Sequence, residues 1–413
     1  MPSLLHLKSL PSHCALDYET ALTSGEPSIH FYREDFRATC AAFTWSEADA
    51  LVSEFVQGEE AIAARLQALH SAGTTLIVHN LSFEYGVTRH RFGLDFEWID
   101  TMRLVQNLDN GGKEDYTPPL LVGDAAVPSF DDEDGEGEDD LSDILAPPKT
   151  KTGVSLTASV SRILPSLYHN HKDEAYSFIR DCGVKAGKEG ANLHLLPLDI
   201  LARYNIGDSE NTWRLYTECT DQFAAMDYDW TPDHQLYTSI VKQVVSAEAR
   251  GIAVNREALA AHIEVVQAEV NAVEATFRTQ FAEQMRAVSA AKEAEEVAKL
   301  KTERGQAKRL AKYALEPIPY NIGSNLQLAK LFVGQLGMTP QFFTAKGAPS
   351  FKSAFLSQWL IGGEILLKRR KRLIVLSHCL ALYELSARDG RWHPQLKAAG
   401  TKTGRMASGS VGE

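Results

Sequence analysis

Short apolar runs alternate with helical patterns over the first 110 residues or so of the chain. Residues 75–78, Thr-Leu-Ile-Val, form an apolar run typical of a buried strand, whereas residues 47–72 have the spacing expected of a helix. Strands that alternate with helices indicate an α/β domain. Acidic side chains follow the predicted strands, which is where open α/β sheets bind their ligands.

The pattern is lost in the next segment of the chain. Residues 117–152 are rich in Pro, Gly and acid, with no hydrophobic period over most of their length. We therefore predict a solvated insertion at about 124–152. A less favoured interpretation is that this segment mimics the DNA backbone and occupies a basic groove when substrate is absent.

Helical periodicity dominates the rest of the chain. It resumes near Leu156, is strong over residues 197–223, and becomes almost continuous after Trp230. A long polar amphipathic run over residues 256–314 contains Gly305 as its one breaker and predicts a projecting helical hairpin. The second half is therefore predicted to be mainly α-helical.

Composition changes this picture in two respects. The formal charge of −12 argues against a nucleic-acid partner, but nine of the 54 acids lie between Asp131 and Asp143, and without them the net charge is −3. Lys and Arg are concentrated after Arg286, so the C-terminal portion is basic. Five separated cysteines without zinc spacing fit a reducing compartment, and no signal-peptide or membrane-spanning pattern occurs. A cytoplasmic protein is expected.

Two acids follow the first apolar run. Asp17 and Glu19 come after Ala15-Leu16, and residues two apart on a strand point to the same face, so both carboxylates can share one ion. An acid-x-acid pair is common by chance in so acidic a chain, and a solvated strand end is the alternative.

A second polar group follows the predicted strand 75–78. His79 and Asn80 come directly after it, with Phe83 and Glu84 beyond. Asn80 could equally be a turn or a helix cap, and Glu84 a first-turn acid favoured by the helix dipole. For His79 a structural role is favoured over metal ligation.

The third group lies on a predicted helix. Tyr204 and Asp208 are four residues apart and therefore share one face. Jointly with Asp17, Glu19 and Glu84, they supply four carboxylates and a phenol from three distant segments. Such oxygen donors suit two Mg²⁺ or Mn²⁺ ions, which can orient a water and stabilise a leaving 3′ oxygen in phosphodiester hydrolysis. Tyr204 would orient or help to deprotonate that water.

These residues, in this order, resemble the 3′-5′ exonuclease domain of family A DNA polymerases, which are DNA polymerase I-like, and within them the phage-type branches. The resemblance implies a ribonuclease H-like fold, catalytic roles for Asp17, Glu19, Glu84, Tyr204 and Asp208, and substrate contacts by Asn80 and Phe83. Family members most often have aspartate where this chain has Glu84. If the gene is phage-encoded, the expected location is the host cytoplasm.

The resemblance extends into the helical half. Residues 236–259 are similar to the segment that enters the polymerase body, residues 320–328 to an Asn-x-x-Ser-x-x-Gln-Leu signature, and residues 343–350 to a Thr-x-x-Gly-x-Pro-Ser loop. Ser324 and Gln327 also fit a capping box. Residues 400–408 resemble the Thr-x-Thr-Gly-Arg motif that the family places against the primer-template duplex, and the substrate contacts that it implies are Thr401, Thr403 and Arg405.

A basic run is the remaining candidate for DNA contact. Residues 368–372 read Lys-Arg-Arg-Lys-Arg, and the resemblance favours phosphate contact by Lys368, Arg369 and Arg370 over a merely solvated helix face. Further cations decorate the predicted hairpin. Sequence-tolerant binding of single-stranded 3′ ends and primer-template duplex is expected.

The whole pattern predicts two domains. An α/β exonuclease domain would span residues 1–225, and a mainly helical thumb with the start of a palm would span residues 226–413. The palm and fingers of the family lie beyond this sequence, so polymerisation by the chain alone is not expected. The alternatives are a noncatalytic DNA-binding or assembly subunit of a split polymerase, whose partner chain carries palm and fingers, and a stand-alone exoribonuclease of the same fold.

Overall fold

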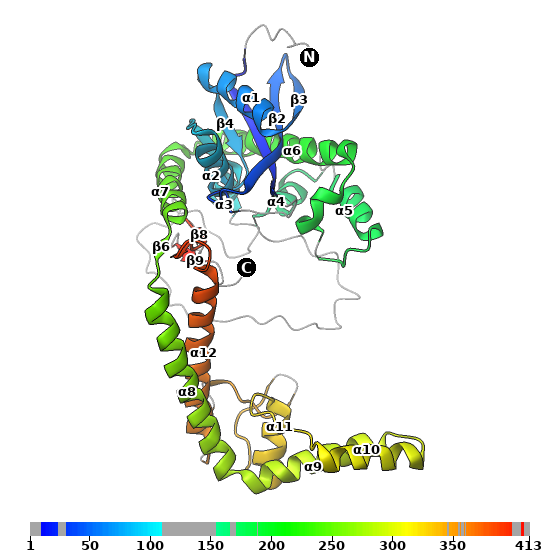
Figure 1. Cartoon of the computed structure of the whole chain (residues 1–413). Helices are drawn as coiled ribbons and strands as arrows, with labels where there is room; N and C mark the ends of the chain where they lie inside the picture. The colour runs from blue at the N-terminus through cyan, green and yellow to red at the C-terminus, as the bar shows by residue number, and fades with distance from the viewer. Residues whose placement is uncertain are drawn as a thin grey trace. The chain divides into compact units, whose positions relative to one another are not determined.

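The computed structural model describes most of the chain (Figure 1). The described residues are 10–23, 30–109, 154–165, 171–187, 189–344, 347–353, 356, 359, 361–398 and 406–408. The predicted insertion at 124–152 lies outside them, as do Thr401, Thr403 and Arg405. The chain divides into two compact units, of which the first comprises Met1–Arg250 with Pro394–Gly409 and the second comprises Gly251–His393 with Ser410–Glu413.

The first unit is built on a mixed five-stranded sheet. Strand β1 is central and antiparallel to β2, which is antiparallel to β3, whereas β4 is parallel to β1 and β5 is parallel to β4. The order across the sheet is β3-β2-β1-β4-β5. The strands are β1 (His13–Leu22), β2 (Phe36–Glu47), β3 (Ala50–Gln57), β4 (Thr75–Val78) and β5 (Trp98–Asp100).

The helix predicted over residues 47–72 is confirmed only in its second part. Its first part is strand β3, and only α1 (Glu59–Ser71) is helical. Ala48 and Asp49 join β2 to β3 with φ values of 51° and 66°, as a two-residue type I′ hairpin turn requires. Strand β3 contains β-branched and aromatic residues, which favour strands. The Ala-rich sequence of α1 follows it directly, so the predicted helix extended back over β3.

Helices cover both faces of the sheet (Figure 1). Leu16 and Tyr18 of β1 belong to a core with α1, α2 (Leu81–Phe92) and α7 (Thr231–Arg250). Ala15, on the opposite face, packs with α3 (Thr101–Asp109), α4 (Leu156–Ile163) and α6 (Leu198–Ala225). Helix α5 (His171–Asp181) and the 3₁₀ helix η3 (Gly190–Leu195) pack beside α6.

The boundary between the units lies later than the predicted 225–226. Helix α7 buries Tyr237, Val241 and Val245 in the core of the first unit, so the first unit continues to Arg250. The short strands β8 (Leu396–Lys397) and β9 (Ala407–Ser408) return to it, and Leu396 donates its backbone N–H to the Glu248 carboxylate.

The second unit is mainly helical, as predicted. Helix α8 (Arg256–Gln280) runs beside α12 (Gly363–Leu385), and the short strands β6 (Ile252–Ala253) and β7 (Arg391–Trp392) pair next to them (Figure 1). A smaller core rich in Phe and Trp joins α9 (Ala282–Ala298) to α11 (Asn325–Ala329) and the π-helix η4 (Lys330–Gln335). Ser324 caps α11 by accepting the Gln327 backbone N–H, which confirms that half of the capping box.

The predicted hairpin over residues 256–314 is shorter than expected. Helix α8 ends at Gln280 and pairs with α12, so only α9 (Ala282–Ala298) and α10 (Glu303–Leu315) form the hairpin. Tyr313 donates its hydroxyl to Glu296, and the Ile318 backbone N–H donates to Glu293 at 2.7 Å.

Within the described residues, no helix has the length and apolar character needed to cross a membrane.

Candidate active site

Strand β1 places the first two acids. Its alternation directs Leu16 and Tyr18 toward one face and Ala15, Asp17 and Glu19 toward the other, where α6 lies. The register with β2 shifts between Glu19 and Thr20, so a bulge ends regular pairing directly after the second acid. Both acids lie on one face of the strand, as predicted, and both are partly buried.

Helix α6 supplies the opposing wall. Tyr204 and Asp208 lie on the same helix, four residues apart, and Tyr204 is only 6% exposed. Between them, Asn205 is fully buried and donates its side-chain amide to Asp17 Oδ2 at 2.6 Å. This hydrogen bond fixes the carboxylate of β1 against α6.

Helix α2 contributes the last carboxylate. Glu84 lies in its first turn and is 4% exposed, and its Oε2 has no hydrogen-bond partner among the described residues. Burial and the nearby charges of Asp17, Asp100 and Glu19 raise its pKa well above the usual range. A first-turn acid that only complements a helix dipole would be solvated, so burial disfavours that interpretation.

The acids act on one another electrostatically. Burial is the main cause that raises the pKa of Asp17 to about 8, and the charge of Asp208 adds to it, while the Asn205 hydrogen bond opposes it. Burial and the charges of Asp17 and Asp208 likewise raise the pKa of Glu19 well above its usual value. Four carboxylates from β1, α2 and α6 are therefore brought into one region in which their negative charges repel.

A cationic group from α5 and a phenolic group from α6 border this region. The pKa of Tyr204 is raised well above its ordinary value by burial and by Asp208, Glu19 and Asp17. Lys172 on α5 places its Nζ 5.8 Å from the centre of the Tyr204 ring, and its charge favours the ionised forms of Asp17 and Glu19. Tyr204 thus faces the acids as a neutral phenol that can donate a hydrogen bond.

A groove opens at Glu19. It has a volume of about 480 Å³ and is lined by Glu19 and Phe83 together with apolar side chains of η3 and α6, among them Leu193 and Leu201. Asn80 is exposed directly before α2 with a left-handed φ of 89°, and it makes no side-chain cap bond. The groove is therefore lined by apolar side chains together with one carboxylate.

Two neighbouring polar residues are structural. His79 engages both ring nitrogens, with Thr101 Oγ1 and with the Val154 carbonyl, each at 2.8 Å. Asp100, fully buried at the end of β5, accepts the backbone N–H groups of Asn80 and Leu81 at 3.0 Å and so caps α2. The Asn80 side chain was one predicted cap of this helix. The Asp100 carboxylate caps α2 instead.

Sequence reasoning missed Asn205, Asp100 and Lys172. Asn205 lies directly after Tyr204, and an amide on the buried face of a helix that carries two predicted site residues was a usable signal. Asp100 directly follows two apolar residues, as Asp17 follows Ala15 and Leu16, but this run was not singled out in the sequence. Nothing in the sequence near Lys172 indicates its position.

The basic run on α12 is largely engaged in structure. Arg369 pairs with Glu274 of α8 at 2.8 Å, Arg372 pairs with Glu269 at 2.9 Å, and Arg370 donates to the Phe351 carbonyl. Lys368 is exposed. Most of this run therefore holds α12 within the second unit.

Across the described ranges, no group of three or more His, Cys, Asp or Glu side chains is already arranged to hold a metal ion. The chemistry of the donor set nevertheless fits a divalent cation, because four mutually repelling carboxylates with an unpartnered buried oxygen are stabilised by positive charge.

The first unit has a mixed sheet covered by helices on both faces, and the second unit is mainly helical. The chain is similar to the solved structure of the POL domain of Pol1 from M. smegmatis, in complex with DNA primer-template and dNTP. The TM-score is 0.52 at 17% sequence identity, over 97% of this chain and 52% of that chain. The chain thus spans about half the length of that polymerase domain, and at this identity the likeness establishes the fold. No protein-family model and no curated protein matches the chain.

Proposed function

We propose that the first unit is a metal-dependent 3′-5′ DNA exonuclease, the proofreading portion of a family A DNA polymerase. The observation that carries the proposal is the convergence of Asp17, Glu19, Glu84 and Asp208 on one buried region with Tyr204 beside them. The strand order, with β1 to β3 antiparallel and β4 and β5 parallel to β1, supports the ribonuclease H-like fold that such nucleases use.

Asp17, Glu19, Glu84 and Asp208 would hold two Mg²⁺ or Mn²⁺ ions. When bound, such a pair supplies charge stabilisation to the phosphate and the leaving oxygen of a phosphodiester and lowers the pKa of a water. Asn205 holds Asp17 in place through its 2.6 Å hydrogen bond. Tyr204, a neutral phenol with a raised pKa, orients the attacking water by hydrogen bonding.

The groove beside Glu19 binds the 3′-terminal nucleotide. Phe83 offers an aromatic edge and Leu193 and Leu201 offer apolar surface to a base, while Asn80 stands exposed at the N-terminal end of α2 for a sugar or phosphate contact. These contacts read no sequence, which suits removal of any mispaired nucleotide.

The test is release of mononucleotides from single-stranded DNA in Mg²⁺ or Mn²⁺. The Asp208→Asn variant removes one proposed ligand at constant volume, and the Asp199→Asn variant is a matched control because Asp199 lies on the same helix with its side chain 70% exposed. We expect Asp208→Asn to lose at least about 100-fold in rate and Asp199→Asn to retain activity. An RNA oligonucleotide of the same sequence tests the exoribonuclease alternative, which predicts faster release from RNA.

A noncatalytic DNA-binding or assembly subunit, whose partner chain carries palm and fingers, is the second candidate. The observation that favours it is the lack, among the described residues, of a ready-made metal arrangement. Equal mononucleotide release by the wild type and Asp208→Asn, at the background rate, would support this candidate and refute the exonuclease.

DNA binding by the second unit is proposed to use the α9–α10 hairpin. Lys301, Arg304, Lys308 and Lys312 are exposed there, and the structure shows no ion pair for them within the described part of the chain. Their phosphate contacts would be independent of sequence.

The location proposed for such a DNA-processing protein with free thiols is the reducing cytoplasm, that of the host if the gene is phage-encoded.

A further inference from the structure

A second cavity lies in the first unit, on residues that the proposed exonuclease does not use. It has a volume of about 590 Å³ and lies between the loop 30–35, the last turn of α2 and the last turn of α7. Four arginines from these three segments line it, together with aromatic side chains; the arginines are Arg33, Arg89, Arg91 and Arg250. A cavity of this size accommodates a nucleotide unit.

The loop 30–35 is firmly seated on α2. Phe31 is 6% exposed and stacks on His90 with ring centres 5.2 Å apart and an interplanar angle of 25°. Its ring occupies the space over Gly86, where a Cβ atom would approach it to 2.5 Å. Only glycine at this position allows the loop to pack so closely. The aromatic floor of the cavity is therefore a built feature of the fold.

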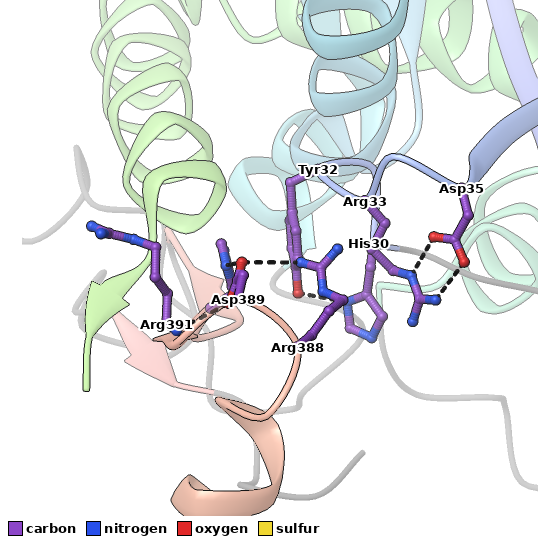
Figure 2. A network of polar contacts seen from close by, with 8 residues as sticks. His30, Tyr32, Arg33, Asp35, Arg388, Asp389 and Arg391 are labelled. Carbon is purple, nitrogen blue, oxygen red and sulfur yellow. Dashed lines mark hydrogen bonds and ion pairs between the residues drawn. The ribbon is translucent and has the colours of Figure 1, made fainter. Parts of the chain in front are cut away.

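Ion pairs hold the guanidinium groups of two arginines at the rim. Arg33 donates to both carboxylate oxygens of Asp35, at 2.8 Å and 2.6 Å, and Tyr32 bonds His30 Nδ1 at 3.1 Å (Figure 2). Arg91 makes a corresponding pair with Glu59 at 3.0 Å. These two guanidinium groups are each paired with a carboxylate, so a ligand in the cavity need not contact them.

The remaining charge exceeds what the helix ends require. One cation in the last turn is enough to complement a helix dipole, but α2 presents two arginines there, Arg89 and Arg91. Arg89 is exposed, and its guanidinium bonds only the Gly93 carbonyl at 3.4 Å among the contacts that the structure shows. Arg250 is exposed at the end of α7. The cavity thus combines exposed cations with the aromatic rings of Tyr32 and His90.

We propose that this cavity binds the phosphodiester backbone of a single nucleic-acid strand. Arg89 and Arg250 contact successive phosphates, and Tyr32 and His90 offer a surface against which a base stacks. The site is separate from the carboxylate region and is independent of the proposed hydrolysis. It gives the first unit a second point of contact with a strand.

The test is fluorescence anisotropy of a labelled 20-nucleotide single-stranded DNA with the full chain in EDTA, so that no hydrolysis occurs. The variant Arg89→Ala/Arg250→Ala is compared with Lys185→Ala/Arg278→Ala, which removes the same charge from two exposed positions outside the cavity. We expect at least about fivefold weaker binding for the first pair and a salt dependence shallower by about 1.4 in log–log slope, because each single-strand phosphate contact contributes about 0.7. Arg89→Lys/Arg250→Lys keeps the charge and is expected to restore most of the affinity.

Three outcomes would overturn the proposal. The first is unchanged affinity of the Arg89→Ala/Arg250→Ala variant, and the second is an equal loss in the control pair. The third is competition by inorganic phosphate or a nucleoside monophosphate at the concentration at which the strand competes, since that would assign the cavity to a free anion. Thermal melting of each variant shows that binding, and not folding, has changed.

Discussion

Replacing Asp17 by Asn should make the metal-free protein more stable while removing nuclease activity. Asp17 is held beside three other carboxylates, and its pKa is raised from 3.8 to about 8. The folded state therefore keeps a proton that the unfolded state releases, so the wild type loses stability as the pH rises from about 4 to about 8. Asn cannot ionise, and the variant escapes this loss.

The magnitude follows from the shift. One pKa unit corresponds to about 1.4 kcal/mol, so the full shift of Asp17 sets a ceiling of about 6 kcal/mol. Solvent reaches the partly exposed carboxylate, and Glu19 and Asp208 continue to repel each other in the variant, so we expect a gain of about 2 kcal/mol at pH 8. For a unit of this size that gain raises Tm by about 4–8 °C.

The assay is thermal unfolding in EDTA at a series of pH values from 4 to 9. The difference between Asp17→Asn and the wild type should be small at pH 4, grow through neutral pH and level off above pH 8, and Mg²⁺ should reduce it by binding the wild-type carboxylates. Asp199→Asn, at an exposed position on α6, should change Tm little at any pH. A variant that is no more stable than the wild type at pH 8 in EDTA would refute the proposed repulsion.

Three further predictions concern other residues. Glu84→Gln should lower nucleotide release at least about 100-fold in a nuclease assay. It should leave the melting temperature unchanged or higher, because it removes a buried carboxylate whose Oε2 has no hydrogen-bond partner among the described residues. A lower Tm with normal activity would contradict the assignment. Asp100→Ala should destabilise the first unit by about 3 kcal/mol in urea unfolding, since it strands the N–H groups of Asn80, Leu81 and Met102 and the hydroxyl of Tyr237; a loss under about 1 kcal/mol would show that other groups cap α2. Lys301→Ala/Lys308→Ala should weaken duplex binding in filter assays and make the log–log dependence of affinity on salt shallower by about 1.8. Arg369→Ala should lower Tm with little effect on DNA binding, because Arg369 pairs with Glu274. The reverse result would assign the DNA contact to α12.

Local patterns were enough to predict the elements that carry the proposed site. Alternation along β1 put Asp17 and Glu19 on one face, and helical spacing put Tyr204 and Asp208 on one side of α6, and both arrangements are present in the structure. The sheet order and the hydrogen bond from Asn205 to Asp17 join segments far apart in the chain, which no local period encodes.

The basic run at 368–372 illustrates the same limit. Its charge density suggests phosphate contact, yet Arg369 and Arg372 are matched by Glu274 and Glu269, about a hundred residues earlier in the chain. Charge along a sequence does not show which cations a folded protein pairs internally. Strand β3 was missed for a related reason, because its pairing with β2 overrides a local helical signal.

The most direct test of the exonuclease proposal is the length distribution of products from a 5′-labelled single-stranded DNA, resolved on a denaturing gel after incubation with Mg²⁺ or Mn²⁺. The proposal predicts a ladder that shortens one nucleotide at a time from the 3′ end, requires the metal, and is absent for Asp208→Asn. An intact oligonucleotide under all metal conditions, or a ladder of equal intensity from Asp208→Asn, would contradict it.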